Sequence, residues 1–100
     1  MSAVTKHARQ RGRERFRLKL TSMIALAAMA LEKGIRVEET AGRLRNYLDG
    51  RQSEHPGTMI RLYAEKVLIY GEQDMLITAY PLPNEFKGTL KKIREAKRAA

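Results

Sequence analysis

The stretch that decides the fold reads MIRLYAEKVLIYGEQDMLITAYPLP, from Met59 to Pro83. Three short runs within it are rich in Ile, Leu, Val, Thr and Tyr, namely Met59–Tyr63, Val67–Tyr70 and Met75–Tyr80. Turn-forming residues separate the runs, at Ala64–Lys66 and at Gly71–Asp74. The pattern predicts a three-stranded antiparallel meander over 59–80, which ends at Pro81 because proline cannot donate to a ladder. So small a sheet needs helices on one face.

Residues 5–50 supply such helices. Thr5 can cap a first helix that ends near Phe16 and shows a narrow, small-residue face through Ala8 and Gly12. Thr21 or Ser22 can cap a second helix that ends at Lys33, with Gly34 as the left-handed residue after it.

The second predicted helix carries MIALAAMAL, Met23–Leu31, which is apolar nearly all round. Such a helix is a central one, and we expect it to lie across the Ile60, Leu62, Val67 and Ile69 face of the sheet. At nine residues, this longest apolar run is about half of a membrane span.

Two further helices complete the order of elements. The third is predicted over Glu38–Asp49, with Gly50 ending it and a polar loop following at Arg51–Gly57. The last is amphipathic and basic and covers 84–98. The chain is therefore expected to be a single α+β domain over 1–100, with N-terminal helices on one face of a small antiparallel meander and a basic C-terminal helix.

Charge is the strongest compositional signal. The formal net charge is +9 over 100 residues, and Lys6–Lys19 holds seven basic residues and one acid. This concentration indicates a polyanionic partner, most commonly nucleic acid. There is no cysteine, which excludes disulfides and thiolate metal sites and favours the cytoplasm. The basic N-terminal residues also argue against a secretory signal.

Alternation along the strands predicts which side chains share a face. With Ala64 and Glu65 as a two-residue turn, Ile60 and Leu62 oppose Ile69 and Val67. The other face would carry Arg61, Tyr63, Tyr70, Thr78 and Tyr80. Tyrosines with a nearby arginine can bind unpaired bases, although tyrosines also simply cover half-exposed sheets.

Common catalytic motifs are absent: there is no phosphate-binding glycine loop, no HExxH and no serine elbow. His7 is the only histidine on a predicted element, because His55 falls in the polar loop beside Pro56. His7, Arg11 and Arg15 recur every four residues and form a ridge along the first helix.

The motifs HARQRGRER (His7–Arg15), LEKGI and LITAYPLP together resemble the small RelE- and barnase-like toxin nucleases. More narrowly, they resemble an uncharacterised bacterial and phage group with an HAxxRxxER helix and a last strand reading ITAYP. The resemblance covers most of Lys6–Pro83. It implies a toxin-type endoribonuclease that needs no metal ion or cofactor. By position, His7, Arg11 and Arg15 match the helical part of the site, and Thr78 and Tyr80 match the strand part.

Cleavage through the 2′-hydroxyl needs a base, an acid and a cation for the phosphorane. His7 suits proton transfer, Arg11 and Arg15 suit the cation, and Tyr80 is the second proton-transfer group or else a stacking platform. The expected nucleic-acid contacts are Lys6, Arg9, Arg13, Arg17, Arg61, Tyr63, Tyr70 and Thr78.

Three functions remain open. The first is a metal-independent endoribonuclease of the toxin type, with an acidic antitoxin as a candidate protein partner. The second is a non-catalytic module that uses the same residues to bind RNA or DNA. The third is a phage-encoded inhibitor that docks on a host nucleic-acid-binding protein. All three place the chain in the cytoplasm and none involves a membrane.

Overall fold

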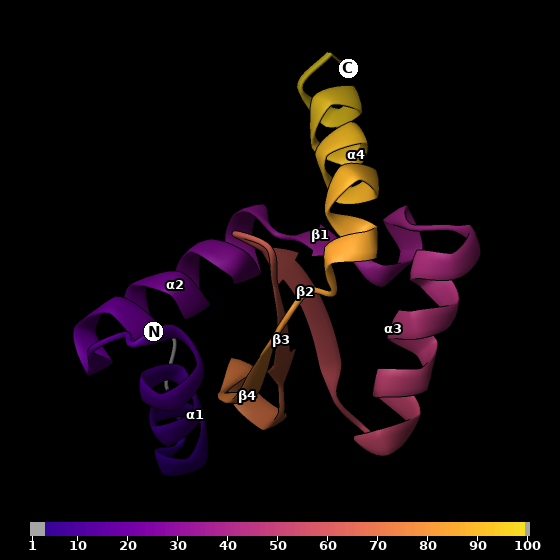
Figure 1. Ribbon diagram of the computed structural model, residues 1–100. Helices are drawn as coiled ribbons and strands as arrows, with labels where there is room; N and C mark the ends of the chain where they lie inside the picture. Colours follow the sequence, from indigo (N-terminus) through magenta and orange to yellow (C-terminus); the bar gives the residue numbers. More distant parts are fainter. Residues whose placement is uncertain (1–3, 100) are drawn as a thin grey trace.

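In the computed structural model, which describes residues 4–99, a four-stranded antiparallel sheet stands between two pairs of helices (Figure 1). The helices are α1 (Lys6–Phe16), α2 (Leu20–Lys33), α3 (Gly42–Glu54) and α4 (Lys87–Ala99). The strands are β1 (Ile35–Arg36), β2 (Met59–Tyr63), β3 (Lys66–Tyr70) and β4 (Leu76–Pro81), in that order across the sheet. Three short 3-10 turns join them, η1 (Val37–Glu39), η2 (Glu72–Asp74) and η3 (Asn84–Phe86). The protein has the α+β fold that the sequence predicts.

The β2–β3 hairpin has the predicted register. Ile60 pairs with Ile69 and Leu62 with Val67, around a two-residue turn at Ala64 and Glu65. Both turn residues have positive φ, 51° and 59°, which is the backbone of a type I′ turn. Strand β1, which pairs Ile35 with Leu62, was not predicted because two residues give no alternation to recognise.

The predicted register of β4 is wrong by one residue. Tyr70 pairs with Leu76, but Ile69 pairs with Thr78, so Ile77 is an extra residue at a β-bulge. Because side chains alternate along a strand, one extra residue moves all later side chains to the opposite face. Thr78 and Tyr80 therefore lie on the face of Ile69 and Val67, not on the face of Tyr70.

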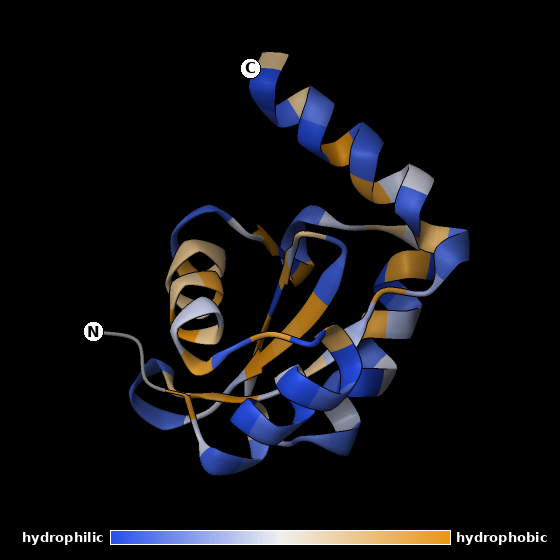
Figure 2. Cartoon of the chain, turned by 60° about the vertical axis from the view of Figure 1, so that its left-hand side comes forward, coloured by the Kyte–Doolittle hydropathy of each residue, from blue (hydrophilic) through white to orange (hydrophobic). Residues whose placement is uncertain are grey.

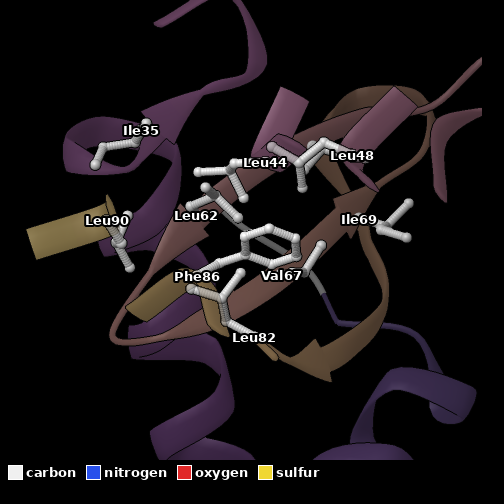
Figure 3. Packing of buried hydrophobic residues seen from close by; sticks show 10 residues of the cluster. Ile35, Leu44, Leu48, Leu62, Val67, Ile69, Leu82, Phe86 and Leu90 are labelled. Atoms are coloured by element: carbon white, nitrogen blue, oxygen red, sulfur yellow. The ribbon is translucent and has the colours of Figure 1, made fainter. Parts of the chain in front are cut away.

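One core lies between the sheet and the pair α3 and α4 (Figure 3). Ile60, Leu62, Val67 and Ile69 contribute the sheet side of it. Ile35 of β1 also belongs to it, and its remaining members lie outside the sheet: Leu44, Leu48, Leu82, Phe86 and Leu90. Leu44 and Leu48 of α3 and Leu90 of α4 thus cover the face that the sequence analysis assigned to the Met23–Leu31 helix.

The second core lies on the opposite face, beneath α1 and α2. Met23, Ala27 and Ala30 of α2 pack there against Leu68 and Tyr70 of β3. The prediction that Met23–Leu31 crosses the Ile60 and Ile69 face is therefore wrong. The sheet is covered on both faces, so four consecutive residues of β3, Val67–Tyr70, are buried.

Helix α2 covers one face of the sheet and is not central. It is apolar nearly all round in Figure 2, yet Ala25 and Ala28 are exposed and Ile24 keeps 38% of its surface accessible. No helix within residues 4–99 is long and apolar enough to span a bilayer.

The ends of α2 and of α3 differ from the prediction. Helix α2 begins at Leu20 without a side-chain cap, and Gly34 after it has φ −68°, so it is not left-handed. Gly34 is close-packed instead, because a β-carbon there would meet the carbonyl of Ala30. Helix α3 begins at Gly42 and runs through Gly50 to Glu54, so Arg51–Glu54 belong to a helix and not to a loop.

Helix α1 has its predicted bounds and covers the outer edge of β4. The Thr5 hydroxyl accepts the Ala8 N–H at 3.1 Å, as an N-cap does. The Thr5 backbone N–H donates to the Leu76 carbonyl at 3.0 Å, and the Arg15 guanidinium donates to the Ala79 carbonyl at 2.6 Å. These bonds satisfy carbonyl groups that an edge strand otherwise leaves open.

Candidate functional site

Five polar and aromatic side chains from three elements meet around the end of β4. We call them the Tyr80 cluster, and they are Arg15 of α1, Tyr47 and Arg51 of α3, His55 just after α3, and Tyr80 of β4. The bulge at Ile77 makes this assembly possible, because it turns Tyr80 toward α3.

Two guanidinium groups lie over the Tyr80 ring. The Cζ atom of Arg51 is 4.3 Å from the ring centroid and that of Arg15 is 4.6 Å away, both within cation–π range. The ring also packs against the core beneath α3. These contacts with this chain's own side chains disfavour a stacking role for the ring, and the hydroxyl is the part of Tyr80 that can transfer a proton.

Arg51 is held from several sides. Its Nε donates to the Tyr47 hydroxyl at 3.2 Å, and its Nη1 lies 3.3 Å from a Glu54 carboxylate oxygen. The hydrogen bond to Tyr47 raises the pKa of Arg51 above its already high ordinary value, with burial opposing that change. The guanidinium therefore stays charged, and 30% of the side chain remains accessible.

His55 contacts the Tyr80 hydroxyl, with 3.3 Å between that oxygen and the ring atom Nε2. The backbone of His55 is fixed where α3 ends before Pro56: its carbonyl accepts the Thr58 hydroxyl, and the Gln52 amide binds the Thr58 hydroxyl at 3.0 Å. Sequence reasoning missed His55 because it ended α3 at Gly50. With the helix extended, Tyr47 and Arg51 stand four residues apart on one side and His55 follows one turn later.

Thr78 adds an unpartnered polar group on the same face. Its side chain is only 3% exposed, and its hydroxyl oxygen has no hydrogen-bond partner within residues 4–99. Thr78 lies two residues from Tyr80 on β4, so both point to the α3 side of the sheet.

Of the three residues of the predicted catalytic ridge, only Arg15 contacts Tyr80. Arg11 instead pairs with Glu14 at 3.0 Å. The hydrogen bond from Gln10, and then the charge of Arg11, lower the pKa of that carboxyl. His7 is exposed, and no hydrogen bond or ring contact in the part of the chain that is described joins it to Tyr80. His7 stands two turns before Arg15, about 12 Å along the helix axis.

The predicted tyrosine face is not an open surface, because α2 covers it. Tyr70 is fully buried and its hydroxyl donates to the Ala27 carbonyl at 2.7 Å. Burial raises the pKa of Tyr70 well above the ordinary tyrosine value. Arg61 is half-buried, with an Nε that has no partner within residues 4–99, and Tyr63 is half-buried at the rim. Tyr70 is thus unavailable to a base, and only Tyr63 retains access.

The remaining predicted contacts on α1 form a basic hollow on its other side. Arg9, Arg13 and Arg17 line it together with Lys19, and its volume is about 480 Å³. None of these four cations has a carboxylate partner among the described residues. Lys6 is exposed one turn before this hollow.

Within residues 4–99, no three His, Cys, Asp or Glu side chains are grouped as ligands for a metal ion. No protein-family model matches the chain, and neither a curated protein nor a solved structure matches it significantly. The assignment of a function therefore starts from the Tyr80 cluster itself, which brings two fixed cations to a hydroxyl–imidazole pair.

Proposed function

We propose that this chain is a metal-independent endoribonuclease of the toxin type, with the Tyr80 cluster as its reaction centre. The observation that carries the proposal is the 3.3 Å contact between His55 Nε2 and the Tyr80 hydroxyl, with Arg15 and Arg51 beside it. The likeness of its helix and strand motifs to RelE- and barnase-like nucleases supports the same activity.

Proton transfer falls to His55 and Tyr80. One of them accepts the proton of the ribose 2′-hydroxyl, whose oxygen attacks the adjacent phosphorus. The bond from phosphorus to the 5′-oxygen breaks, and the other group gives that oxygen a proton. The products are a 2′,3′-cyclic phosphate and a 5′-hydroxyl. Histidine is suited to either role because it exchanges protons near neutral pH.

Charge stabilisation falls to Arg15 and Arg51. A guanidinium has five N–H donors, and the contacts to the Ala79 carbonyl, Tyr47 and Glu54 use only some of them. The donors that remain can bridge two oxygens of a phosphorane, which carries more negative charge than the starting phosphodiester.

RNA binding is assigned to the unpaired cations of α1. Arg9, Arg13, Arg17 and Lys19 surround the basic hollow described above. Each phosphate of a single strand that they neutralise should contribute about 0.7 to the slope of log affinity against log salt. We expect binding to weaken steeply as salt rises.

Incubation of the purified protein with a uniform RNA, with and without a chelator, tests the activity. We expect cleavage in both, with fragments that end in a 2′,3′-cyclic phosphate. His55→Ala and Tyr80→Phe should each reduce the rate at least a hundredfold, whereas His7→Ala should leave it within a few-fold of the wild type.

Two outcomes would replace this function. Salt-sensitive RNA binding without cleavage, in preparations of matched purity, would make the chain a nucleic-acid-binding module. If the protein did not bind RNA even at low salt, the function that remains would be that of an inhibitor that docks on a nucleic-acid-binding protein. A loss of cleavage in His7→Ala but not in His55→Ala would move the reaction centre along α1.

A further inference from the structure

An open hollow adjoins the Tyr80 cluster on α3, the helix that forms one outer side of the domain (Figure 1). Its volume is about 430 Å³, which is in the range of small-ligand sites. Five residues line it: Asn46, Tyr47, Gly50, Arg51 and Glu54. Tyr47 and Arg51 also belong to the Tyr80 cluster, so the hollow and the proposed reaction centre share a wall. A group attached to a phosphate on Arg51 can therefore reach the hollow.

Helical spacing explains the shape of this hollow. Asn46, Gly50 and Glu54 follow one another at intervals of four residues, so they form one row along the exposed side of α3. A β-carbon on Gly50 would meet nothing within 4 Å, and the middle of the row is therefore open. The polar side chains at its two ends stand about 12 Å apart along the helix axis. A planar base has room to lie against the helix between them.

Glu54 brings a free hydrogen-bond acceptor to one end of the row. Its Oε1 accepts a hydrogen bond from Arg51 at 3.3 Å, whereas its Oε2 has no hydrogen-bond partner within residues 4–99. The side chain is 57% exposed, and an ionised carboxylate can only accept. The exposed Asn46 at the other end can donate or accept, so Glu54 is the group that can select among bases.

The four bases of RNA differ in what they present to an acceptor. Adenine, cytosine and guanine each carry an exocyclic amino group, which donates hydrogen bonds. Uracil carries carbonyl oxygens in place of an amino group, and an oxygen that faces a carboxylate is repelled. A site that pairs one substrate and repels another discriminates by both effects. The free oxygen of Glu54 therefore favours a base with an amino group.

We infer that this hollow is a base subsite of the reaction centre. It binds the base of a nucleotide next to the scissile phosphate, with the amino group of that base donating to Glu54 Oε2, and it discriminates against uracil. The inference rests on the proposed function, because it places an RNA phosphate on Arg51. It adds to that function a sequence preference and the residue that determines it.

Titration with nucleoside 3′-monophosphates tests the subsite without cleavage, because these ligands have no phosphodiester bond. The backbone amide signals of Asn46 and Gly50 in ¹H–¹⁵N correlation spectra report binding at the hollow itself. We expect the adenosine, cytidine and guanosine ligands to shift both signals. Uridine 3′-monophosphate should bind about fivefold or more weakly, which is the worth of one hydrogen bond to a charged group.

Glu54→Gln should bring the four dissociation constants within about twofold of one another, because a glutamine amide both donates and accepts. Asp49→Asn is the matched control. Asp49 lies on the same helix, is 58% exposed and pairs with Arg45 at 3.4 Å, much as Glu54 pairs with Arg51, but it does not line the hollow. This variant should keep the preference of the wild type.

Gly50→Leu should fill the hollow and weaken binding of the three amino-bearing ligands about fivefold or more. Gly88→Leu is its control, since Gly88 is exposed on α4 and a β-carbon there also meets nothing within 4 Å. It should bind all four ligands as the wild type does. Both glycines stand at open helical positions, so neither leucine should prevent folding.

Equal affinity for the four ligands would overturn the inference, and so would unchanged binding in Gly50→Leu. Equal loss of the preference in Glu54→Gln and Asp49→Asn would also overturn it, because it would indicate a general effect of charge. These outcomes are separate from the proposed activity. Base-selective binding without RNA cleavage would keep the subsite and remove the nuclease, whereas cleavage with no selectivity would remove only the subsite.

Discussion

The side chain of Met23 fills the space in which a β-carbon on Gly12 would stand. Gly12 is buried on α1 and Met23 is fully buried on α2, so the absence of a side chain at Gly12 sets how closely these helices approach. The contact links the helix that carries Arg15 to the helix that covers Tyr70.

Gly12→Ala is expected to lower the free energy of unfolding by about 1–2 kcal/mol. Overpacking of a core costs about 1–3 kcal/mol, and the better helix propensity of alanine returns up to about 1. Gly50→Ala is the matched control, because a β-carbon there meets nothing within 4 Å inside α3. It should raise stability by about 0.5–1 kcal/mol in urea denaturation. Equal effects of the two changes would contradict the packing described.

Tyr70→Phe should destabilise the protein at neutral pH by about 0.5–1.5 kcal/mol, because it removes the hydrogen bond to the Ala27 carbonyl. Burial raises the pKa of Tyr70 in the folded state, so the folded protein keeps this proton when the unfolded chain loses it. Stability from this group is therefore complete below about pH 10, the ordinary tyrosine value, and declines above it.

The phenylalanine variant has no such proton to lose. Denaturation curves collected from about pH 9 to 11 should thus show the stability difference between wild type and Tyr70→Phe shrinking as the pH rises. A difference that stays constant over this range would argue against a buried, protonated Tyr70.

Thr5→Ala should cost about 1 kcal/mol, because it removes the N-cap of α1 that binds the Ala8 N–H. The same hydroxyl lies 3.4 Å from the Ile77 carbonyl, beside the bulge in β4. Thr5→Ser keeps the oxygen and should restore most of the stability. Thermal denaturation of the wild type, Thr5→Ala and Thr5→Ser makes the comparison. If Thr5→Ser were as unstable as Thr5→Ala, the hydroxyl would not be the stabilising group.

Arg15→Lys is expected to slow single-turnover RNA cleavage about a hundredfold with little change in stability. An ammonium cannot bind the Ala79 carbonyl and two phosphate oxygens with the geometry of a guanidinium. Arg13→Lys retains the same charge two residues away, on the other side of α1, and should cleave normally. If both variants were equally impaired, Arg15 would be only part of the general basic surface.

The hairpin and most helix positions could be predicted, because local chemistry determines them. A two-residue turn fixes the pairing of Ile60 with Ile69, and the Thr5 cap marks the start of α1. The position of α2 was predicted on the wrong face, although the run Val67–Tyr70 carried a usable signal. Four consecutive apolar residues are typical of a strand covered on both sides, which requires helices on each face.

The candidate site was only partly predictable. Arg15 and Tyr80 were identified, but the partner of the Tyr80 hydroxyl is His55 and not His7. Gly50 reads as a helix end in the sequence, whereas α3 continues through it to Glu54. The packing of Leu44 and Leu48 in the core outweighs the low helix propensity of glycine. Nothing in the local sequence marks Ile77 as a bulge. Its presence depends on how η2 and β4 fit against β3, and that is a tertiary effect.

The bulge at Ile77 makes the length of the last loop and strand as important as their residue types. Deletion of that one residue would leave Thr78, Tyr80 and both arginines in the chain, yet it would return Tyr80 to the face that α2 covers. A relative that retained every residue of the cluster but had lost one position between Gly71 and Thr78 would then lack the site. Spacing in this segment is a criterion for shared activity that a comparison of residue identities alone would overlook.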